Sequence, residues 1–508
     1  MIAVAIFSAL LAASLLVTMR VQPANEVEVY KKYLRARGEK LELSEVVPPP
    51  VAPEDNSVDA VEEAFGRFGS GEVRIPYAMR MVAPGKALIA WQQPDVRGGD
   101  FTNSWDEFTA GMEADRPAIE LLHHVLERPK LDFQLDYHQG AAMLLPHLAP
   151  MKRAAQRLAA AAVLDLHEGQ SGAAATNLLT LLALVHNDVR DEILISHLVR
   201  IAMAAIAVTP TWEWLQATNV MDVQMAAVQS GWQQLDFLSD AETAFEMERA
   251  SSAATIQKSR RTHEDYQATF GISLSGSGSA SSGGSDWPDI LEDLTAGPRM
   301  ALAESMWRSS WSYSAELNTL KDNQVILEAL RAMQTNQSQF YQADYNAMAA
   351  RLWRLGPTNS GAIFFRALKI PDFREYFGDA ALANSVRKSL QAETMRRVVI
   401  TAIALKRFQL AHGPWPETLG ELAPKFLPSV PIDPYDGKPL KYHSNADGTF
   451  LLYSVGDDGV DDGGDTTPAK SASSFSLSNW NWLRARDWVW PQPASPVEVQ
   501  AFYEHPPK

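Results

Sequence analysis

The aspartates near the carboxyl end are the residues whose types and spacing are best suited to metal binding or catalysis. The stretch YSVGDDGVDDGGD, residues 453–465, holds five aspartates and four glycines, with no lysine or arginine to neutralise them. Carboxylates are hard oxygen ligands, and glycines let a backbone turn its carbonyls inward. The stretch is therefore a loop folded around a cation, a solvated acidic turn or, as a third alternative, a catalytic carboxylate cluster.

The sequence lacks the familiar motifs of other kinds of catalysis. The chain has no cysteine, which excludes disulfides, thiolate metal sites and a cysteine nucleophile. His123 and His124 are adjacent and point in different directions on a helix, and the HExxH spacing does not occur. A nucleophile elbow, a P-loop and a dinucleotide-binding glycine motif are missing too. We therefore expect a non-enzymatic body, with a metal-assisted hydrolase using the aspartate loop as the rival interpretation.

Composition limits the class of protein and of partner. Of the 508 residues, 46% are hydrophobic and 21% are charged, which is typical of a globular protein. The formal net charge of −16 is unfavourable for contact with a phosphate backbone, so no nucleic-acid partner is expected. The adjacent pairs Arg260, Arg261 and Arg396, Arg397 are expected on solvated helix faces.

The amino-terminal end carries an apolar segment. Residues 2–19 are uncharged and end at Arg20. As a helix they span about 27 Å, close to the thickness of a hydrocarbon core. A membrane anchor is predicted, with a cleaved signal peptide and a buried helix as alternatives. We assign residues 1–22 to this anchor or signal segment, and residues 23–57, which contain VVPPPVAPEDNS, to a proline-rich spacer.

Residues 58–380 are assigned to a helical body. Its first part, up to about residue 115, is mixed, with short strands expected at residues 75–79 and 86–91, and helical periodicity begins near residue 116. Leu178, Leu181, Leu182 and Val185 recur at three- and four-residue spacing, as one buried helix face requires. Breaks in the pattern around Gly169 to Gly172 and around Asn187 and Asp188 separate the helices, and helices joined by turns this short lie antiparallel to their neighbours. Residues 272–287, ISLSGSGSASSGGSDW, are expected to be a flexible linker inside this body. The predicted fold class is mainly α: a helical-hairpin array followed by a C-terminal α+β domain.

The C-terminal domain is predicted from a long helix and a hairpin. Residues 385–412 read as one amphipathic helix that ends at Gly413. In LKYHSNADGTFLLYS, two short strands flank Asp447 and Gly448, a pair typical of tight hairpin turns. The helix is expected to cover one face of a small antiparallel sheet.

Residues 385–466 resemble the globular part of the major pseudopilins of type II secretion systems. A long helix, His-Gly-x-x-Pro, a short leucine-bearing helix, Asp-Pro-x-x-Gly-x-Pro-x-x-Tyr and Tyr-Ser-x-Gly-x-Asp-Gly follow one another. The matching residues are Gly413, Pro416, Leu419, Leu422, Asp433, Pro434, Gly437, Pro439, Tyr442, Tyr453, Ser454, Gly456, Asp458 and Gly459.

The resemblance implies a calcium ion in the loop after the last strand. It makes Asp458 the firmest ligand and Asp461, Asp462 and Asp465 candidates, because this loop carries an extra residue and lacks the family's Ala-Asp ending. A fibre subunit is not expected, because the pilin-like helix begins far inside the chain and residues 2–19 contain no glutamate.

The tail, residues 467–508, is rich in tryptophan. Trp480, Trp482, Trp488 and Trp490 fall within eleven residues. Such a tail either packs back on the helical body or forms a docking surface for protein, glycan or membrane.

Together these features predict a membrane-anchored envelope protein that binds or scaffolds protein partners, and the resemblance points to a place near a secretion or pilus-like system. The cations that follow residues 2–19 favour a cytoplasmic body by the positive-inside rule, and a cytoplasm-facing adaptor is one alternative. The resemblance to exported modules instead favours a body on the periplasmic side of a bacterial inner membrane, which is the localisation we predict.

Overall fold

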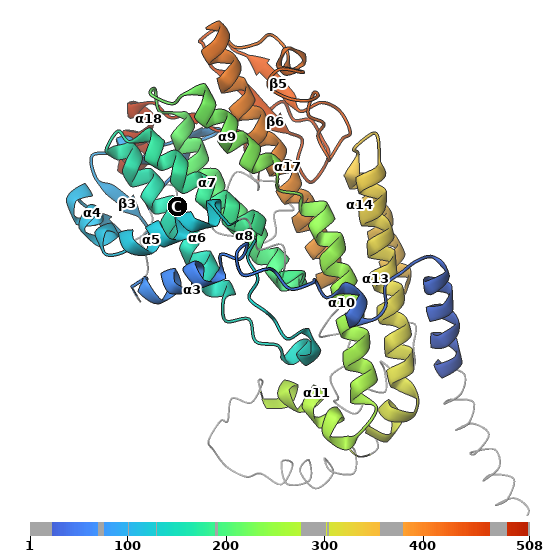
Figure 1. Ribbon diagram of the computed structural model, residues 1–508. Coiled ribbons are helices and arrows are strands. Elements are labelled where there is room, and N and C mark those ends of the chain that lie inside the picture. The colour runs from blue at the N-terminus through green and yellow to red at the C-terminus, as the bar shows by residue number, and fades with distance from the viewer. Residues whose placement is uncertain are drawn as a thin grey trace, which may run out of the picture.

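The computed structural model describes most of the chain (Figure 1). The described ranges are 23–69, 76–99, 101–128, 130–187, 191–275, 301, 304–355, 379–467 and 485–505. The predicted membrane segment 1–22 and most of the predicted linker 272–287 lie outside these ranges. The described part is mainly helical with small sheets, as the predicted fold class requires.

The first third of the chain folds into short elements. The helices are α2 (Leu43–Val46), α3 (Val58–Arg67), η1 (Ala90–Gln92), α4 (Trp105–Glu113), α5 (Arg116–Leu122), η2 (His123–Leu126) and η3 (Tyr137–Ala142). The strands are β1 (Met81–Ala83), β2 (Lys86–Ala87), β3 (Val96–Gly98) and β4 (Phe101–Asn103). β1 pairs with β2, and β3 with β4, in antiparallel fashion.

The helical body follows these short elements, and its first helices pack on their neighbours in the chain. Its helices are α6 (Leu148–His167), α7 (Ser171–Asn187), α8 (Leu194–Leu215), α9 (Asp222–Gln233), α10 (Phe237–Ser259), α11 (His263–Ser275), η5 (Trp307–Trp311), α13 (Ser312–Thr335) and α14 (Tyr341–Leu355). Helices α6, α7 and α8 pack on one another, and the predicted break after α6 falls at Gly169, whose φ is +76°. The helices α10 and α13 run side by side below them (Figure 1).

Helix α8 is the one described helix long and apolar enough to cross a membrane by length and composition. Most of its apolar stretch, 72%, is buried inside the protein. It packs against α6, α7, α10 and α17 (Asp379–His412), which explains its all-round apolar surface as that of a core helix.

The C-terminal region contains the long helix and the hairpin that the sequence predicts. Its helices are α17 (Asp379–His412), η6 (Leu419–Leu422) and α18 (Pro496–Glu504), and its strands are β5 (Lys441–Ser444), β6 (Phe450–Ser454), β7 (Trp488–Val489) and β8 (Gln492–Pro493). The antiparallel sheet has the order β5-β6-β7, with Tyr442 opposite Leu452. α17 ends before Gly413, whose φ is +92°, and packs against β6.

The predicted boundary at residues 380–385 does not separate two hydrophobic cores. The same α17 that covers the sheet also packs against α8, α9, α10 and α14, and one buried apolar cluster runs from Val61 to Trp490. Beyond residue 466, the tail supplies β7 to the sheet and β8 to a parallel pairing with β2.

The tail packs back onto the protein where it is described. Trp488 and Trp490 are buried, whereas Trp480 and Trp482 lie outside the described residues. The indole of Trp212 in α8 donates a hydrogen bond to the carbonyl of Pro491 at 2.8 Å. The tail therefore links the C-terminal sheet to the helical body.

Residues 23–57 are not a free spacer. Residues 23–36 are helical, and Leu34 and Leu41 are buried against Ala253 of α10 and Leu320 of α13. This helix lies along α13 in Figure 1. The prolines further along interrupt regular structure without detaching the chain, because Ser57 is buried and its N–H bonds the carbonyl of Lys130.

Candidate functional site

The acidic loop, residues 456–467, follows β6. In it, Asp458 accepts a hydrogen bond from the N–H of Val460 at 3.0 Å. Asp461 accepts one from the hydroxyl of Tyr453 at 2.9 Å and one from the N–H of Gly463 at 3.1 Å. These two carboxylates thus stabilise turns in their own parts of the loop.

The other two predicted ligands lie beside a cation from the tail. Asp465 accepts hydrogen bonds from the N–H and the hydroxyl of Thr467, both at 2.9 Å. The guanidinium of Arg486 lies 3.8 Å from Asp462 and 3.7 Å from Asp465. The loop has no basic residue of its own, but the tail brings one to it.

The four predicted calcium ligands do not form a coordination shell as they lie. Calcium needs about six to eight oxygens converging on one point. Across the described ranges, no three acidic or histidine side chains are grouped so that they could hold a metal ion. The arrangement does not fit the site that the resemblance implies, and calcium binding stays a prediction.

Asp487 is the carboxylate that organises the loop, and sequence reasoning missed it. It is fully buried and accepts hydrogen bonds from the N–H groups of Asp462 at 3.5 Å, Gly464 at 2.7 Å and Asp465 at 3.1 Å. Burial raises the pKa of Asp487, while these N–H donors act in the opposite direction. The local sequence RARDWVW gives no signal of this role, because its partners lie more than twenty residues away.

Asp433 plays a similar part at the other end of the loop. It is fully buried and accepts hydrogen bonds from the N–H of Tyr435 at 3.0 Å, the hydroxyl of Ser454 at 2.9 Å and the N–H of Val455 at 2.8 Å. Burial raises the pKa of Asp433. Its place in the Asp-Pro-x-x-Gly motif marked it as a matching residue, although not as a buried anchor.

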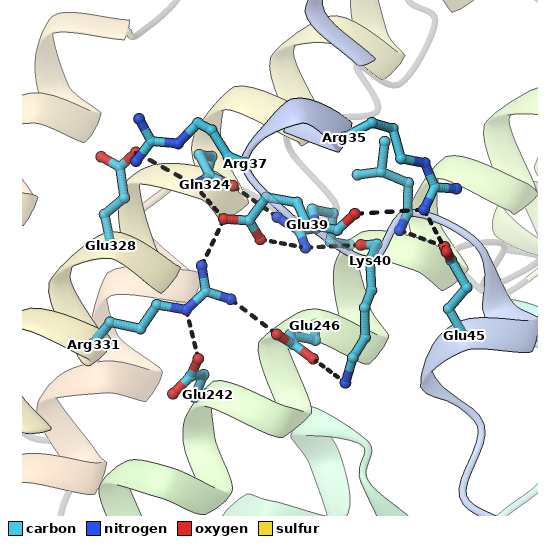
Figure 2. A network of polar contacts seen from close by, with 12 residues as sticks. Arg35, Arg37, Glu39, Lys40, Glu45, Glu242, Glu246, Gln324, Glu328 and Arg331 are labelled. Atoms are coloured by element: carbon cyan, nitrogen blue, oxygen red, sulfur yellow. Dashed lines mark hydrogen bonds and ion pairs between the residues drawn. The ribbon is translucent and has the colours of Figure 1, made fainter. Parts of the chain in front are cut away.

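A second polar cluster joins the N-terminal segment to the body; we call it the N-terminal clamp (Glu39, Lys40, Arg249, Gln324 and Arg331). The buried Glu39 accepts hydrogen bonds from Arg249 at 3.0 Å, Gln324 at 2.9 Å and Arg331 at 2.6 Å. Figure 2 shows Glu39 among side chains of α10 and α13. Burial alone raises the pKa of Glu39, but these hydrogen bonds outweigh it and lower the pKa to about 2.

The clamp extends to two further glutamates of α10. Arg331 donates to Glu242 at 2.5 Å and to Glu246 at 2.9 Å, and Lys40 donates to Glu246 at 3.1 Å (Figure 2). Because charges of both signs alternate, each buried group has a partner of opposite charge. The cluster connects three segments, and its central carboxylate, that of Glu39, is buried.

The basic pairs expected on solvated faces are in part structural. Arg396 and Arg397 both bond the buried Glu393 at 2.8 Å. Arg397 also donates to the carbonyl of Ile432 at 2.8 Å. In the other pair Arg260 bonds the buried Glu316, and only Arg261 is exposed. The expectation of solvated faces was wrong for Arg396, Arg397 and Arg260, because each has a buried acidic partner on its own helix or on another segment.

The structure brings together one buried set with the residue types of a serine hydrolase. His147 lies 2.6 Å from Asp191, and the hydroxyl of Ser196 donates to the same Asp191 oxygen at 2.9 Å. In a catalytic triad the serine bonds the histidine, whereas here both bond the aspartate. All three side chains are buried, so the set is a satisfied polar core.

Comparisons with known proteins give no relative for this chain: no protein-family model, no curated protein and no solved structure matches it.

Proposed function

We propose that this chain is a non-enzymatic scaffolding or binding protein of the bacterial envelope. It is attached to the membrane through residues 2–19 and carries a C-terminal unit similar to the globular part of the major pseudopilins. The proposal rests on one observation: the buried polar side chains of the described residues hold the fold together. The polar side chains best suited to chemistry instead join segments that are distant in the sequence, as Glu39 does in the clamp and Asp487 in the loop.

A hydrolase that uses the aspartate loop is not proposed. General acid–base catalysis needs a carboxylate within reach of a substrate proton and free to exchange it. Asp458, Asp461 and Asp465 are each engaged with donors of their own loop. A fibre subunit is not proposed either, because the surfaces of α17 that face away from the sheet are covered by α8, α9, α10 and α14.

Three of the cations that follow residues 2–19 have acidic partners within the fold. Lys31 lies 2.5 Å from Glu316, Arg37 lies 3.5 Å from Glu328, and Arg35 pairs with Glu45. These side chains therefore have a structural reason to be basic, independent of membrane topology. The proposal keeps the body on the periplasmic side, as the resemblance to exported modules favours.

The absence of native cysteine makes the topology directly testable. Trp353 in α14 is 85% exposed, so a Trp353→Cys variant carries one accessible thiol. We expect a membrane-impermeant maleimide to label it in intact spheroplasts. Leu320→Cys, at a fully buried position, is the control that reacts only after unfolding. Labelling of Trp353→Cys only after lysis would contradict the proposal and indicate the cytoplasm-facing adaptor.

The same variant tests the scaffolding role. A thiol-attached photo-crosslinker at position 353, activated in native membranes, is expected to give discrete adducts heavier than the chain alone. If this position and a second exposed one, Val497→Cys in α18, give no adduct under any growth condition, a scaffolding role is wrong.

A further inference from the structure

The acidic loop is folded around an anion. The carboxylate of Asp487 lies where three backbone N–H groups of the loop converge, those of Asp462, Gly464 and Asp465. A loop that encloses a cation has the opposite polarity, because carbonyl and carboxylate oxygens must point inward. Converging N–H groups form an anion-binding concavity and repel a metal ion.

Two glycines produce this inward turn of the N–H groups. Gly463 and Gly464 have φ values of +73° and +85°, which residues with a side chain rarely adopt. A Cβ atom at Gly464 would also lie 3.1 Å from the side chain of Leu451 in β6. The sequence predicted that these glycines turn backbone carbonyls inward, but in the structure they direct backbone N–H groups toward Asp487.

The tail closes the loop through its backbone as well as its charges. The N–H of Arg486 bonds the carbonyl of Thr467 at 2.9 Å, and that of Asp487 bonds the carbonyl of Asp465 at 3.0 Å. The Arg486 guanidinium, half exposed, lies near the carboxylates of Asp462 and Asp465 and supplies the positive charge that these aspartates lack within the loop. One dipeptide thus contributes the central anion and the outer cation.

We propose that the acidic loop is closed by Arg486 and Asp487 and needs no metal ion, so that two side chains of the chain itself take the place that the resemblance gives to calcium. The C-terminal sheet then keeps its fold whatever the calcium concentration of the compartment.

Hydrogen exchange of the loop amides in the full chain tests the proposal. For the unaltered chain, we expect the same exchange rates in peptides covering residues 456–467 with excess calcium chloride and with EGTA. Asp487→Asn removes the charge that the N–H groups of Gly464 and Asp465 bond, so exchange there is expected to rise about tenfold or more. Asp458→Asn is the matched control, because Asp458 accepts its hydrogen bond from Val460 and not from Gly464 or Asp465, and it should leave the rates at Gly464 and Asp465 unchanged.

Two results would overturn the proposal. One is a clear slowing of loop exchange by calcium in the unaltered chain that Asp458→Asn abolishes, which would show a calcium site. The other is an Asp487→Asn variant that folds and exchanges at the unaltered rate. If that variant does not fold, the comparison of calcium with EGTA in the unaltered chain decides alone.

Discussion

Glu39 shows most plainly what single charged residues do in this molecule. Its carboxylate is buried, and it pairs with Arg249, whose side chain is fully buried too. A buried charge that loses its partner is strongly destabilising, because desolvation is no longer offset. The stability of the N-terminal segment on the body therefore depends on this pair.

We expect Glu39→Ala to lower the free energy of unfolding by about 3–5 kcal/mol, because Arg249 is left buried without its carboxylate. Urea unfolding of the full chain measures this. Glu63→Ala is the matched control: Glu63 pairs with Arg67 on an exposed surface of α3, and such pairs contribute no more than about 1 kcal/mol. Equal losses for the two variants would show that the clamp does not carry the stability assigned to it.

Glu213 in α8 provides a pH-dependent contribution to stability. It is fully buried and accepts hydrogen bonds from the N–H groups of Met79 at 2.8 Å and Ala90 at 3.0 Å. Burial raises its pKa from 4.5 to about 8, although these donors act in the opposite direction. Between pH 4.5 and about 8, Glu213 is deprotonated in the unfolded chain but still protonated in the folded chain. The contribution of Glu213 to the free energy of unfolding is therefore complete below about pH 4.5 and is lost as the pH rises toward 8.

Glu213→Gln should therefore flatten the fall in stability between pH 5 and 8, a fall of up to about 1.4 kcal/mol per pH unit from this group. Denaturant unfolding at a series of pH values checks the difference between the unaltered and variant chains. Glu62→Gln, an exposed carboxylate of α3, is the control and should leave the slope unchanged. A slope that Glu213→Gln does not alter would mean that Glu213 titrates normally in the folded chain.

At the residue scale the sequence located the acidic loop but not what closes it. The types of Asp457 to Asp465 are visible in the sequence, and so is their excess of negative charge. The burial of Asp487 and the approach of Arg486 are not, because both depend on a tail that returns across an interval of about twenty residues. The calcium prediction for Asp458, Asp461, Asp462 and Asp465 awaits measurement.

At the scale of elements, α17 was well predicted and its charged side was not. Its apolar positions, such as Val386, Leu390 and Ile403, recur with helical period, and all three are buried. Periodicity identifies the apolar face but says nothing of the partners available to the polar one. Arg396 and Arg397 thus seemed solvated, although Glu393, one turn earlier, binds both.

The strand β7 was missed because two residues give too short a pattern to recognise. Its Trp488 is nearly fully buried, and its ring lies edge-on to Tyr435 with the centroids 5.0 Å apart. Burial of so large a side chain is a main apolar contribution of the tail to the sheet.

We expect Trp488→Ala to cost about 3–5 kcal/mol of unfolding free energy, because it leaves a cavity between the sheet and the loop. Trp353→Ala is the matched control, since this indole is 85% exposed and its loss should stay within about 0.5 kcal/mol. Thermal and urea unfolding of both variants provide the comparison. A neutral Trp488→Ala would indicate that the tail is not part of the folded sheet.

At the scale of the whole molecule, the chain behaves as one body where the sequence predicted several parts. Proline-rich, glycine-rich and tryptophan-rich stretches suggested boundaries, because such compositions often mark linkers. Long-range hydrogen bonds instead join these parts. The indole of Trp212 bonds the carbonyl of Pro491, and the N–H of Gln492 bonds the carbonyl of Gly85 at 2.9 Å. Contacts between such distant segments leave no local trace in the sequence.

The packing of α17 makes the C-terminal helix-and-sheet unit an inseparable part of the helical body. Equilibrium unfolding of an isolated 380–508 fragment, followed by near-ultraviolet circular dichroism beside the full chain, tests it most directly. We predict no cooperative transition for the fragment, because the faces of α17 that pack on α8, α9, α10 and α14 would be left exposed to water. A sharp transition in the fragment, with the tryptophan signal of the intact protein, would show that residues 380–508 form an independent domain.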